Sequence, residues 1–197
     1  MSAKSEQKTR SHAAILESAA RLLRERGIAG ARVAEVMRGA GLTVGGFYAH
    51  FDSKESLIDA TLRAGAAAVR ERLFARLEEK PEGERVEAIL KRYLSAAHRD
   101  ERDGGCPLPV VAGEIGTRER AHEAAFASGL EAHTASLEAL LPSAGPLPRR
   151  ALALALLALM IGGLSVSRAV AGTALSEEVL RACRSLGALA VRRVPRA

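Results

Sequence analysis

Two short runs of the sequence contain residue types that enzymes use in catalysis, and neither belongs to a complete catalytic motif. His98-Arg99-Asp100 matches the letters of a kinase catalytic loop, but no glycine-rich loop or Asp-Phe-Gly run accompanies it. His122-Glu123 begins a His-Glu-x-x-His zinc motif, yet Phe126 stands where the second histidine is needed. Gly-x-Ser-x-Gly and the phosphate-binding P-loop do not occur either. We therefore expect no enzymatic activity, no cofactor and no metal site.

The two cysteines occupy different sequence contexts. Cys106 follows two glycines and precedes Pro107, a context typical of a helix N-terminus, where the reactive thiolate is favoured. This context indicates either a redox- or electrophile-sensing thiol or merely a small residue at the start of a helix. Cys183 is expected to be buried. Two cysteines in 197 residues make no disulfide framework, and we find no signal peptide, so the sequence predicts a cytoplasmic protein.

Other aromatic and polar side chains on predicted helices after residue 55 can line a small-molecule pocket. These candidate ligand-binding residues, together with Cys106, are Tyr93, His98, Phe126 and His133. His133 lies on an apolar face, three residues after Leu130 and four before Leu137. A histidine packed in the core is the alternative interpretation of that position.

Residues 44–51 are predicted to form a short helix with two unlike faces. At 100° per residue, Phe47 and Phe51 lie on one face and can anchor the helix in a small core. The opposite face carries Gly45 and Gly46, each of which costs about 1 kcal/mol in a helix interior. This pattern indicates either a close approach of the backbone to DNA or a surface helix whose glycines are incidental.

The glycine face of residues 44–51 belongs to a predicted group of three short helices. They are predicted at residues 9–26, 32–39 and 44–51, preceded by a loose polar arm at residues 2–12. Gly27 is expected to end the first helix, and a glycine turn at residues 39–42 separates the other two. Thr43 is expected to cap the third helix. This is the helix-turn-helix arrangement, in which the second helix of the pair enters the major groove of DNA.

Basic residues are concentrated at the same end of the chain. Residues 1–54 contain nine Lys or Arg against five Asp or Glu, a net charge of +4, whereas the other 143 residues carry +2. This distribution indicates a polyanionic partner. The alternatives are a solvated charged face and a surface for anionic lipid, although the first predicted helix has no bulky aromatic residue to insert into a membrane.

The remaining sequence predicts six more helices and no strand, which gives an all-α fold of nine helices. They are expected at residues 53–79, 83–100, from 106 onward, 117–141, 148–171 and 175–193. Ser53 is expected to cap the first of these, with an incomplete capping box because Ser56 replaces Glu. Residues 151–167 are uncharged, which suits a helix buried between two subunits, a core helix of one subunit or a minimal membrane span. We expect a buried helix and no membrane span.

Residues 41–57, which read GLTVGGFYAHFDSKESL, resemble the signature of the tetracycline-repressor (TetR/AcrR) family, roughly A-G-V-S-x-G-x-L-Y-x-H-F-x-S-K-E-x-L. Ala40 and the Gly27 break extend the resemblance. It implies an all-α dimer, with a DNA-binding domain at residues 1–54 and a ligand-sensing and dimerisation domain at residues 55–197. The last two helices of each subunit would pair across the dimer axis.

The same resemblance implies the residues that contact DNA. Phosphate contacts would come from Thr43, Tyr48 and Lys54, and contacts at or near base edges from Val44, Gly45, Gly46 and His50. Arg32 departs from the family pattern, which has Ser or Thr there. Arginine cannot cap the second helix as those residues do, but it can bind phosphate directly.

The function implied is a cytoplasmic homodimeric repressor that binds a palindromic DNA operator and releases it when a small molecule binds or a thiol is modified. A DNA-binding regulator controlled by a protein partner is one alternative, and a helical interaction protein without ligand sensing is another. With few polar side chains on the groove face, DNA shape is expected to contribute to specificity.

Overall fold

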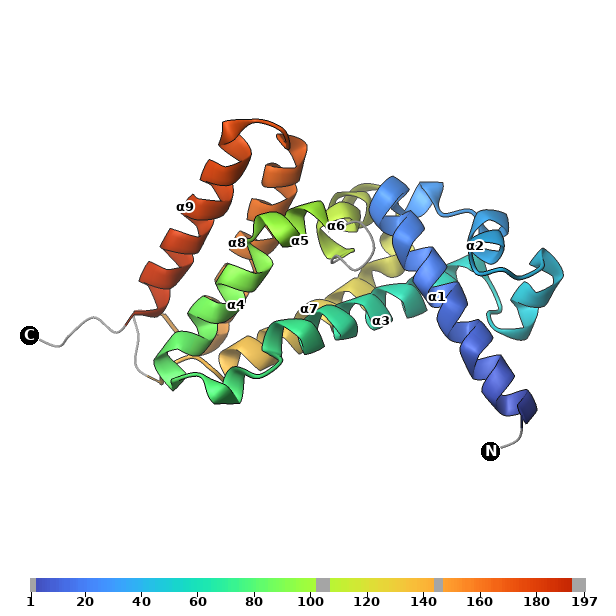
Figure 1. Ribbon diagram of the computed structural model, residues 1–197, viewed down its shortest axis with the longest axis horizontal. Coiled ribbons are helices and arrows are strands. Elements are labelled where there is room, and N and C mark those ends of the chain that lie inside the picture. The colour runs from blue at the N-terminus through green and yellow to red at the C-terminus, as the bar shows by residue number, and fades with distance from the viewer. Residues whose placement is uncertain (1–2, 102–106, 144–146, 193–197) are drawn as a thin grey trace, which may run out of the picture. The chain divides into compact units, whose positions relative to one another are not determined.

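The computed structural model describes residues 3–101, 107–143 and 147–192, and within these ranges every regular element is a helix (Figure 1). The described residues form nine α-helices and four 3₁₀ helices, without a strand. This confirms the predicted all-α fold of nine helices. The described chain divides into two compact units, residues 3–67 with 107–129 and residues 68–101 with 130–143 and 147–192.

The first unit contains the N-terminal helices and a later segment of the chain. Its elements are α1 (Ala3–Gly30), α2 (Val33–Gly39), the 3₁₀ helix η1 (Val44–Ala49), the beginning of α3 (Lys54–Phe74), α6 (Leu108–Thr117), η4 (Arg120–His122) and the beginning of α7 (Glu123–Glu138). Their apolar faces share one core, which includes Ile15, Leu23, Val36, Met37, Phe47, Leu57, Ile58 and Val111. This core holds α1, α2 and η1 in place.

Helix α1 is longer than predicted at both ends. It begins at Ala3, so residues 3–12 are helical and the prediction of a loose arm was wrong for them. Gly27 interrupts the helix with φ 70° and ψ −172°, a left-handed φ that glycine adopts without penalty. One further turn follows, and the helix ends at Gly30 rather than at Gly27.

The start of α3 corrects the prediction of an incomplete capping box. The Ser56 amide donates to Ser53 Oγ at 3.1 Å, and the Ser53 amide donates to Ser56 Oγ at 3.2 Å. A serine hydroxyl therefore makes the reciprocal bond that a glutamate makes in the usual box. Two amides at the helix start are satisfied in this way, which fixes where α3 begins.

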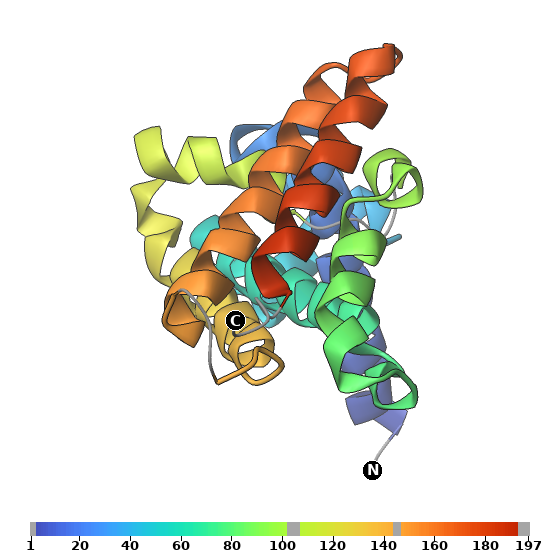
Figure 2. The ribbon, with the colours of Figure 1, turned by 90° about the vertical axis from the view of Figure 1, so that its left-hand side faces the viewer.

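The second unit is built around two antiparallel C-terminal helices. Its elements are the end of α3, η2 (Leu77–Glu79), η3 (Glu82–Glu84), α4 (Arg85–Tyr93), α5 (Ala96–Asp100), the end of α7, α8 (Arg149–Ala169) and α9 (Ala174–Val191). Helices α8 and α9 lie side by side in both views (Figures 1 and 2). Gly163 permits this close packing, because a Cβ there would lie 2.7 Å from Cys183 Sγ of α9. Gly187 permits α9 to pack closely on α4, because a Cβ there would lie 2.8 Å from Leu90 Cδ1.

Two predicted helices of this unit end earlier than the sequence suggested. The helix predicted to reach residue 79 ends at Phe74, and Arg76 then adopts a left-handed conformation with φ 56°. The helix predicted at 83–100 is two helices, because the backbone turns at Leu94 and Ser95 caps α5 by accepting the His98 amide at 3.1 Å. A left-handed residue thus marks the first break, and side-chain capping by Ser95 marks the second.

Arginine side chains satisfy carbonyl groups at the ends of three helices in this unit. Arg92 donates to the carbonyl oxygens of Leu73 and Ala75 at 2.6 and 2.7 Å, after the last residues of α3. Arg168 does the same for His98 and Arg99 of α5, and Arg184 donates to Leu94 after α4. Guanidinium groups suit this position because they donate several hydrogen bonds and carry a charge opposite to the helix C-terminus.

Helix α8 is, among the described residues, the one helix long and apolar enough to cross a membrane by length and composition. It spans 21 residues with a mean hydropathy of 1.9 over its most apolar window, of which 44% is buried inside the chain. One side, which includes Leu156, Met160 and Leu164, packs in the core of the second unit. Leu154 and Val166 remain exposed on the other side.

Candidate nucleic-acid interface

The turn between α2 and η1 is a glycine-dependent helix stop. Gly41 has φ 70°, its amide donates to Arg38 O at 3.0 Å, and the Leu42 amide donates to Met37 O at 2.9 Å. These two bonds form a Schellman motif, which satisfies the last carbonyls of α2 and reverses the chain within two residues. The turn predicted at residues 39–42 is therefore present, and it brings η1 close to α2.

The element after the turn is a 3₁₀ helix, not the predicted α-helix. Its characteristic three-residue bonds run from the Gly46 amide to Thr43 O at 3.1 Å and from the His50 amide to Phe47 O at 2.9 Å. Two glycines in a six-residue segment weaken α-helical propensity, and 3₁₀ winding is common in such short pieces. Phe47 and Phe51 are 2% and 6% exposed, with ring centroids 5.9 Å apart, so the predicted aromatic anchor is in place.

The outer side of η1 is bare. A Cβ at Gly45 would have no atom within 4 Å, and one at Gly46 would make only ordinary contacts at 3.9 Å. Tyr48 and Val44 project beside this face and are 75% and 51% exposed. Packing within the chain therefore does not require either glycine, and the open backbone is available for close contact with a ligand.

The residues before α2 and η1 occupy N-cap positions without capping through their side chains. Thr43 has an extended backbone, and its carbonyl accepts the Gly46 amide, but its hydroxyl makes no cap hydrogen bond. The prediction that Thr43 caps the third helix therefore holds for its backbone and was wrong for its side chain. Arg32 precedes α2 without a side-chain cap bond, as its residue type predicts. Both side chains are exposed next to η1 and α2.

Lys54 lies at the start of α3 with its ammonium group engaged within the chain. Lys54 Nζ donates to Ile28 O in the last turn of α1 at 3.1 Å. The side chain is half-buried, so it helps to join α3 to α1. No local pattern predicts this contact, because the two residues are 26 positions apart.

His50 ends η1 in a small cluster of rings that the sequence did not predict. The His12 ring of α1 stacks on Phe51 at a centroid distance of 4.8 Å and lies 5.8 Å from the His50 ring. Burial lowers the pKa of His50 below its usual 6.5, and the neighbouring His12 and Lys8 lower it further. Each of these effects disfavours the protonated form of His50, and both neighbouring residues belong to α1.

A carboxylate of α6 supports the end of α1. Glu114 Oε2 accepts the amides of Ile28 and Ala29 at 3.0 and 3.4 Å, directly after the interruption at Gly27. Only glycine fits at residue 27, since a Cβ there would lie 1.8 Å from Glu114 Oε1 in addition to the left-handed φ. Sequence reasoning missed Glu114, because the pairing joins positions 86 residues apart.

The structure distributes the predicted ligand-binding residues over both units. His98 Nδ1 donates to the Tyr93 carbonyl at 2.8 Å, and the two rings meet edge to face at 4.6 Å, so these residues form one buried cluster in the second unit. His133 is buried in the second unit too, whereas Phe126 lies on the part of α7 that packs in the first. Cys106 lies outside the described residues.

One hollow of the second unit lies beside this cluster. It has a volume of about 490 Å³ and is lined by Val69, Leu73, Ala97, His98 and, around its polar side, Arg72, Arg92, Ser95 and Glu101. Of the predicted ligand-binding residues that the structure describes, only His98 lines it. Arg72 and Glu101 form an ion pair at 2.6 Å, so the hollow combines apolar walls with paired charges.

Helix α2 and η1 are joined by a glycine stop, and η1 is held by buried phenylalanines while its outer side is open. This arrangement defines the helix-turn-helix class of protein. Within this class, residues 15–61 match the model of the bacterial regulatory proteins of the tetR family. The HTH-type transcriptional repressor KstR2 of Rhodococcus jostii (strain RHA1) is 45% identical over 49 residues, which are 25% of this chain and 24% of that protein. The N-terminal part of the chain is therefore similar to tetR-family regulators.

Solved structures of other proteins share the fold over nearly the whole chain. The reduced form of NemR from E. coli superimposes with a TM-score of 0.81 at 21% identity, over 94% of this chain and 98% of that one. A putative TetR-family regulator from Rhodococcus sp. gives 0.78 at 17% identity, over 93% and 100%. The curated relative KstR2 is matched over only about a quarter of its length. The structural neighbours therefore show the fold of the chain. The sequence matches show that its N-terminal segment is similar to tetR-family proteins.

Proposed function

We propose that this protein is a DNA-binding transcriptional repressor. The observation that carries this proposal is the bare outer side of η1, where Gly45 and Gly46 leave the backbone open although nothing inside the chain requires glycine. A short helix held by two buried phenylalanines and flanked by exposed Tyr48 suits insertion into the major groove. In this proposal residues 1–54 bind DNA, and residues 55–197 sense an effector and dimerise.

The DNA contacts that we propose are of two kinds. Exposed Arg32, Thr43 and Tyr48 can donate hydrogen bonds to phosphate oxygens, and Lys54 adds a positive charge at the start of α3. Val44, Gly45, Gly46 and His50 lie where base edges would be met. Because this set offers few directional hydrogen bonds, we expect sequence-dependent DNA shape and contact with thymine methyl groups to supply much of the specificity.

The second unit supports the proposal of a homodimer. Exposed apolar side chains occur on the solvent-facing parts of α8 and α9: Leu154 and Val166 on α8, and Leu175, Leu186 and Leu189 on α9. Such a surface is typical of a subunit interface. A symmetric pairing of α8 and α9 would cover it and would place two DNA-binding heads on one palindromic operator. This use of α8 favours a cytoplasmic protein over a membrane protein.

We propose that a small-molecule effector binds in the second unit and lowers the affinity for DNA. The hollow beside His98 is of a size that holds a small ligand, with apolar walls and a few polar groups. Tyr93 and His133 are buried in the same unit. We propose Phe126 and Cys106 as further effector-binding residues. Control by a protein partner is the second candidate for how DNA release is triggered.

The test of the proposal is a matched pair of glycine substitutions. Gly45→Glu puts a carboxylate on the proposed groove face, and Gly113→Glu puts the same charge on α6, where a Cβ also has no atom within 4 Å. Both variants should fold. We expect Gly45→Glu to lower the affinity for the DNA upstream of the protein's own gene by at least about 100-fold, because an uncompensated charge would meet the DNA backbone and bases.

Affinities for that DNA would be measured by fluorescence anisotropy over a salt series, with a scrambled duplex as the non-specific reference. Gly113→Glu should bind within about threefold of the unmodified protein. Equal affinities for the two glutamate variants would contradict the proposed interface. Binding of the unmodified protein no tighter than to the scrambled duplex would contradict a specific operator at that locus.

A further inference from the structure

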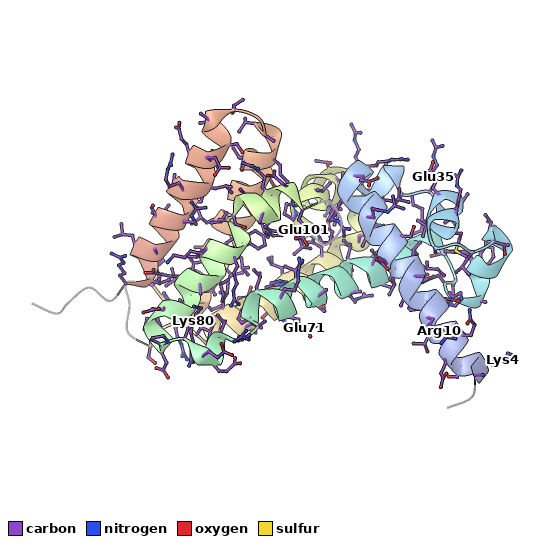
Figure 3. All side chains as sticks on the ribbon, viewed as in Figure 1. Lys4, Arg10, Glu35, Glu71, Lys80 and Glu101 are labelled. Carbon is purple, nitrogen blue, oxygen red and sulfur yellow. The ribbon has the colours of Figure 1, made fainter. Side chains whose placement is uncertain are left out.

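The first turns of α1 carry a row of two lysines and a histidine. Lys4, Lys8 and His12 are spaced four residues apart in a continuous helix, and we call this row the α1 stripe. Residues at this spacing lie on the same face of an α-helix. Lys4 and Lys8 are exposed, and Figure 3 shows Lys4 and Arg10 on the turns of α1 next to the N-terminal end.

The α1 stripe lies on the side of α1 that is next to η1. His12, its last member, stacks on Phe51 and lies 5.8 Å from His50, the residue that ends η1. Lys8, one turn earlier, is close enough to His50 to lower the pKa of that imidazole. The stripe therefore continues the surface of η1 along α1, and both belong to the first unit.

The charges of the stripe do not serve the stability of α1. Positive side chains in the first turns oppose the partial positive charge of a helix N-terminus, and two lysines four residues apart repel each other. Among the described residues neither lysine forms an ion pair with an acidic side chain, and neighbouring Arg10 donates to Gln7 rather than to a carboxylate. These lysines lower the stability of α1, and binding of an external anion would explain why they are there.

We propose that the α1 stripe binds the DNA backbone beside the groove that η1 enters, an inference that rests on the proposed function. From Lys4 to His12 the helix rises about 12 Å at 1.5 Å per residue. Over that length one strand of B-DNA carries three or four phosphates, at roughly one per 3.4 Å. The stripe thereby adds phosphate contacts that are independent of base sequence to those around η1.

The test uses the full-length protein with a double substitution, Lys4→Gln with Lys8→Gln. Neutralising two phosphate contacts should make the slope of log K against log salt less negative by about 1.8, at about 0.9 per contact. Affinities for the upstream DNA and for the scrambled duplex should fall by the same factor, because the contacts carry no sequence information. Lys80→Gln with Lys91→Gln makes the same charge change in the second unit and should leave the slope unchanged.

The outcomes separate the stripe from the proposed function. If the unmodified protein binds the upstream DNA specifically and Gly45→Glu abolishes this, while Lys4→Gln with Lys8→Gln keeps the full salt slope, the stripe proposal is overturned and the repressor proposal stands. If the double variant loses binding to anionic phosphatidylserine vesicles but keeps the DNA slope, a lipid surface replaces DNA as the partner. Circular dichroism would verify that helix content is retained.

Discussion

The reason for a glycine differs between positions of this chain, and the atoms around each glycine show which reason applies. At Gly27 the left-handed φ and the nearby Glu114 carboxylate leave no room for a side chain. At Gly45 the backbone is in an open region where any side chain fits, so the roughly 1 kcal/mol that glycine costs in a helix is not offset inside the chain. The first glycine serves the fold, and the second is the one that points to a partner.

His98 gives a prediction for the dependence of stability on pH. Burial lowers the pKa of His98 below 6.5, although its hydrogen bond to the Tyr93 carbonyl acts in the opposite direction. The unfolded chain therefore takes up a proton at a higher pH than the folded protein does. As the pH falls below about 6.5 the unfolded state is favoured, and this loss of stability continues until the lower folded pKa is reached.

His98→Asn should reduce that loss, because an asparagine amide can donate to the Tyr93 carbonyl without titrating. Urea unfolding at pH 7.5 and pH 5.5 measures the loss for each protein. We expect the free energy of unfolding to fall less for His98→Asn than for the unmodified protein, with His50 contributing equally to both. An identical fall in the two proteins would show that proton uptake by His98 does not cause the loss of stability at low pH.

Among the elements, α1, α3 and α6 meet at a single residue. The Ile28 amide donates to Glu114 of α6, and the Ile28 carbonyl accepts from Lys54 of α3. The interruption of α1 at Gly27 exposes these backbone groups, and each is satisfied by a side chain from another helix. Helix α1 is thus hydrogen-bonded to a residue of α6 that follows Ile28 by 86 positions.

Glu114→Ala should destabilise this junction. Removing the carboxylate leaves the part-buried Ile28 amide without its acceptor, which costs about 1–3 kcal/mol of unfolding free energy, whereas the exposed Ala29 amide can bond to water. Hydrogen exchange at these two amides, together with urea unfolding, measures the effect. Glu114→Gln retains an acceptor oxygen and should lose less, and Glu119→Ala is the matched control. Unchanged protection of the Ile28 amide in Glu114→Ala would show that this bond is not maintained in solution.

At the scale of the whole molecule, the proposed dimer depends on the outer sides of α8 and α9. Leu186 and Leu189 are 57% and 68% exposed on α9, and burying each against a partner would contribute about 1.5–3 kcal/mol. Leu186→Glu with Leu189→Glu should therefore raise the dimer dissociation constant by at least about 100-fold. Sedimentation equilibrium measures this change.

Leu147→Glu provides the control for the dimer, because Leu147 is 49% exposed but precedes α8. It should sediment as the unmodified protein does. A monomeric unmodified protein, or a double variant that remains dimeric, would contradict the proposed interface. Operator binding should weaken together with dimerisation, since two heads on one palindrome bind more tightly than one.

The sequence by itself determined the features that depend on near neighbours. The glycine stop at residues 39–42, the aromatic anchor of Phe47 and Phe51, the helical content and the family signature at residues 41–57 all follow from local backbone preferences and side-chain spacing. Some helix ends were less well predicted, because Ser95 starts a new helix through a hydrogen bond that propensity does not capture. The proposed DNA-contacting residues came from the same local signature and stay proposals.

The tertiary structure decided what joins distant segments. The stacking of His12 on Phe51, the bonds from Glu114 to Ile28 and Ala29, and the division of the described chain into two units that do not follow sequence order all require the folded chain. The structure likewise showed that residues 3–12 are helical and therefore present Lys4, Lys8 and His12 as one row. The physical reason is that a local pattern specifies which face of a helix is apolar, whereas packing and buried backbone groups select the partner for that face.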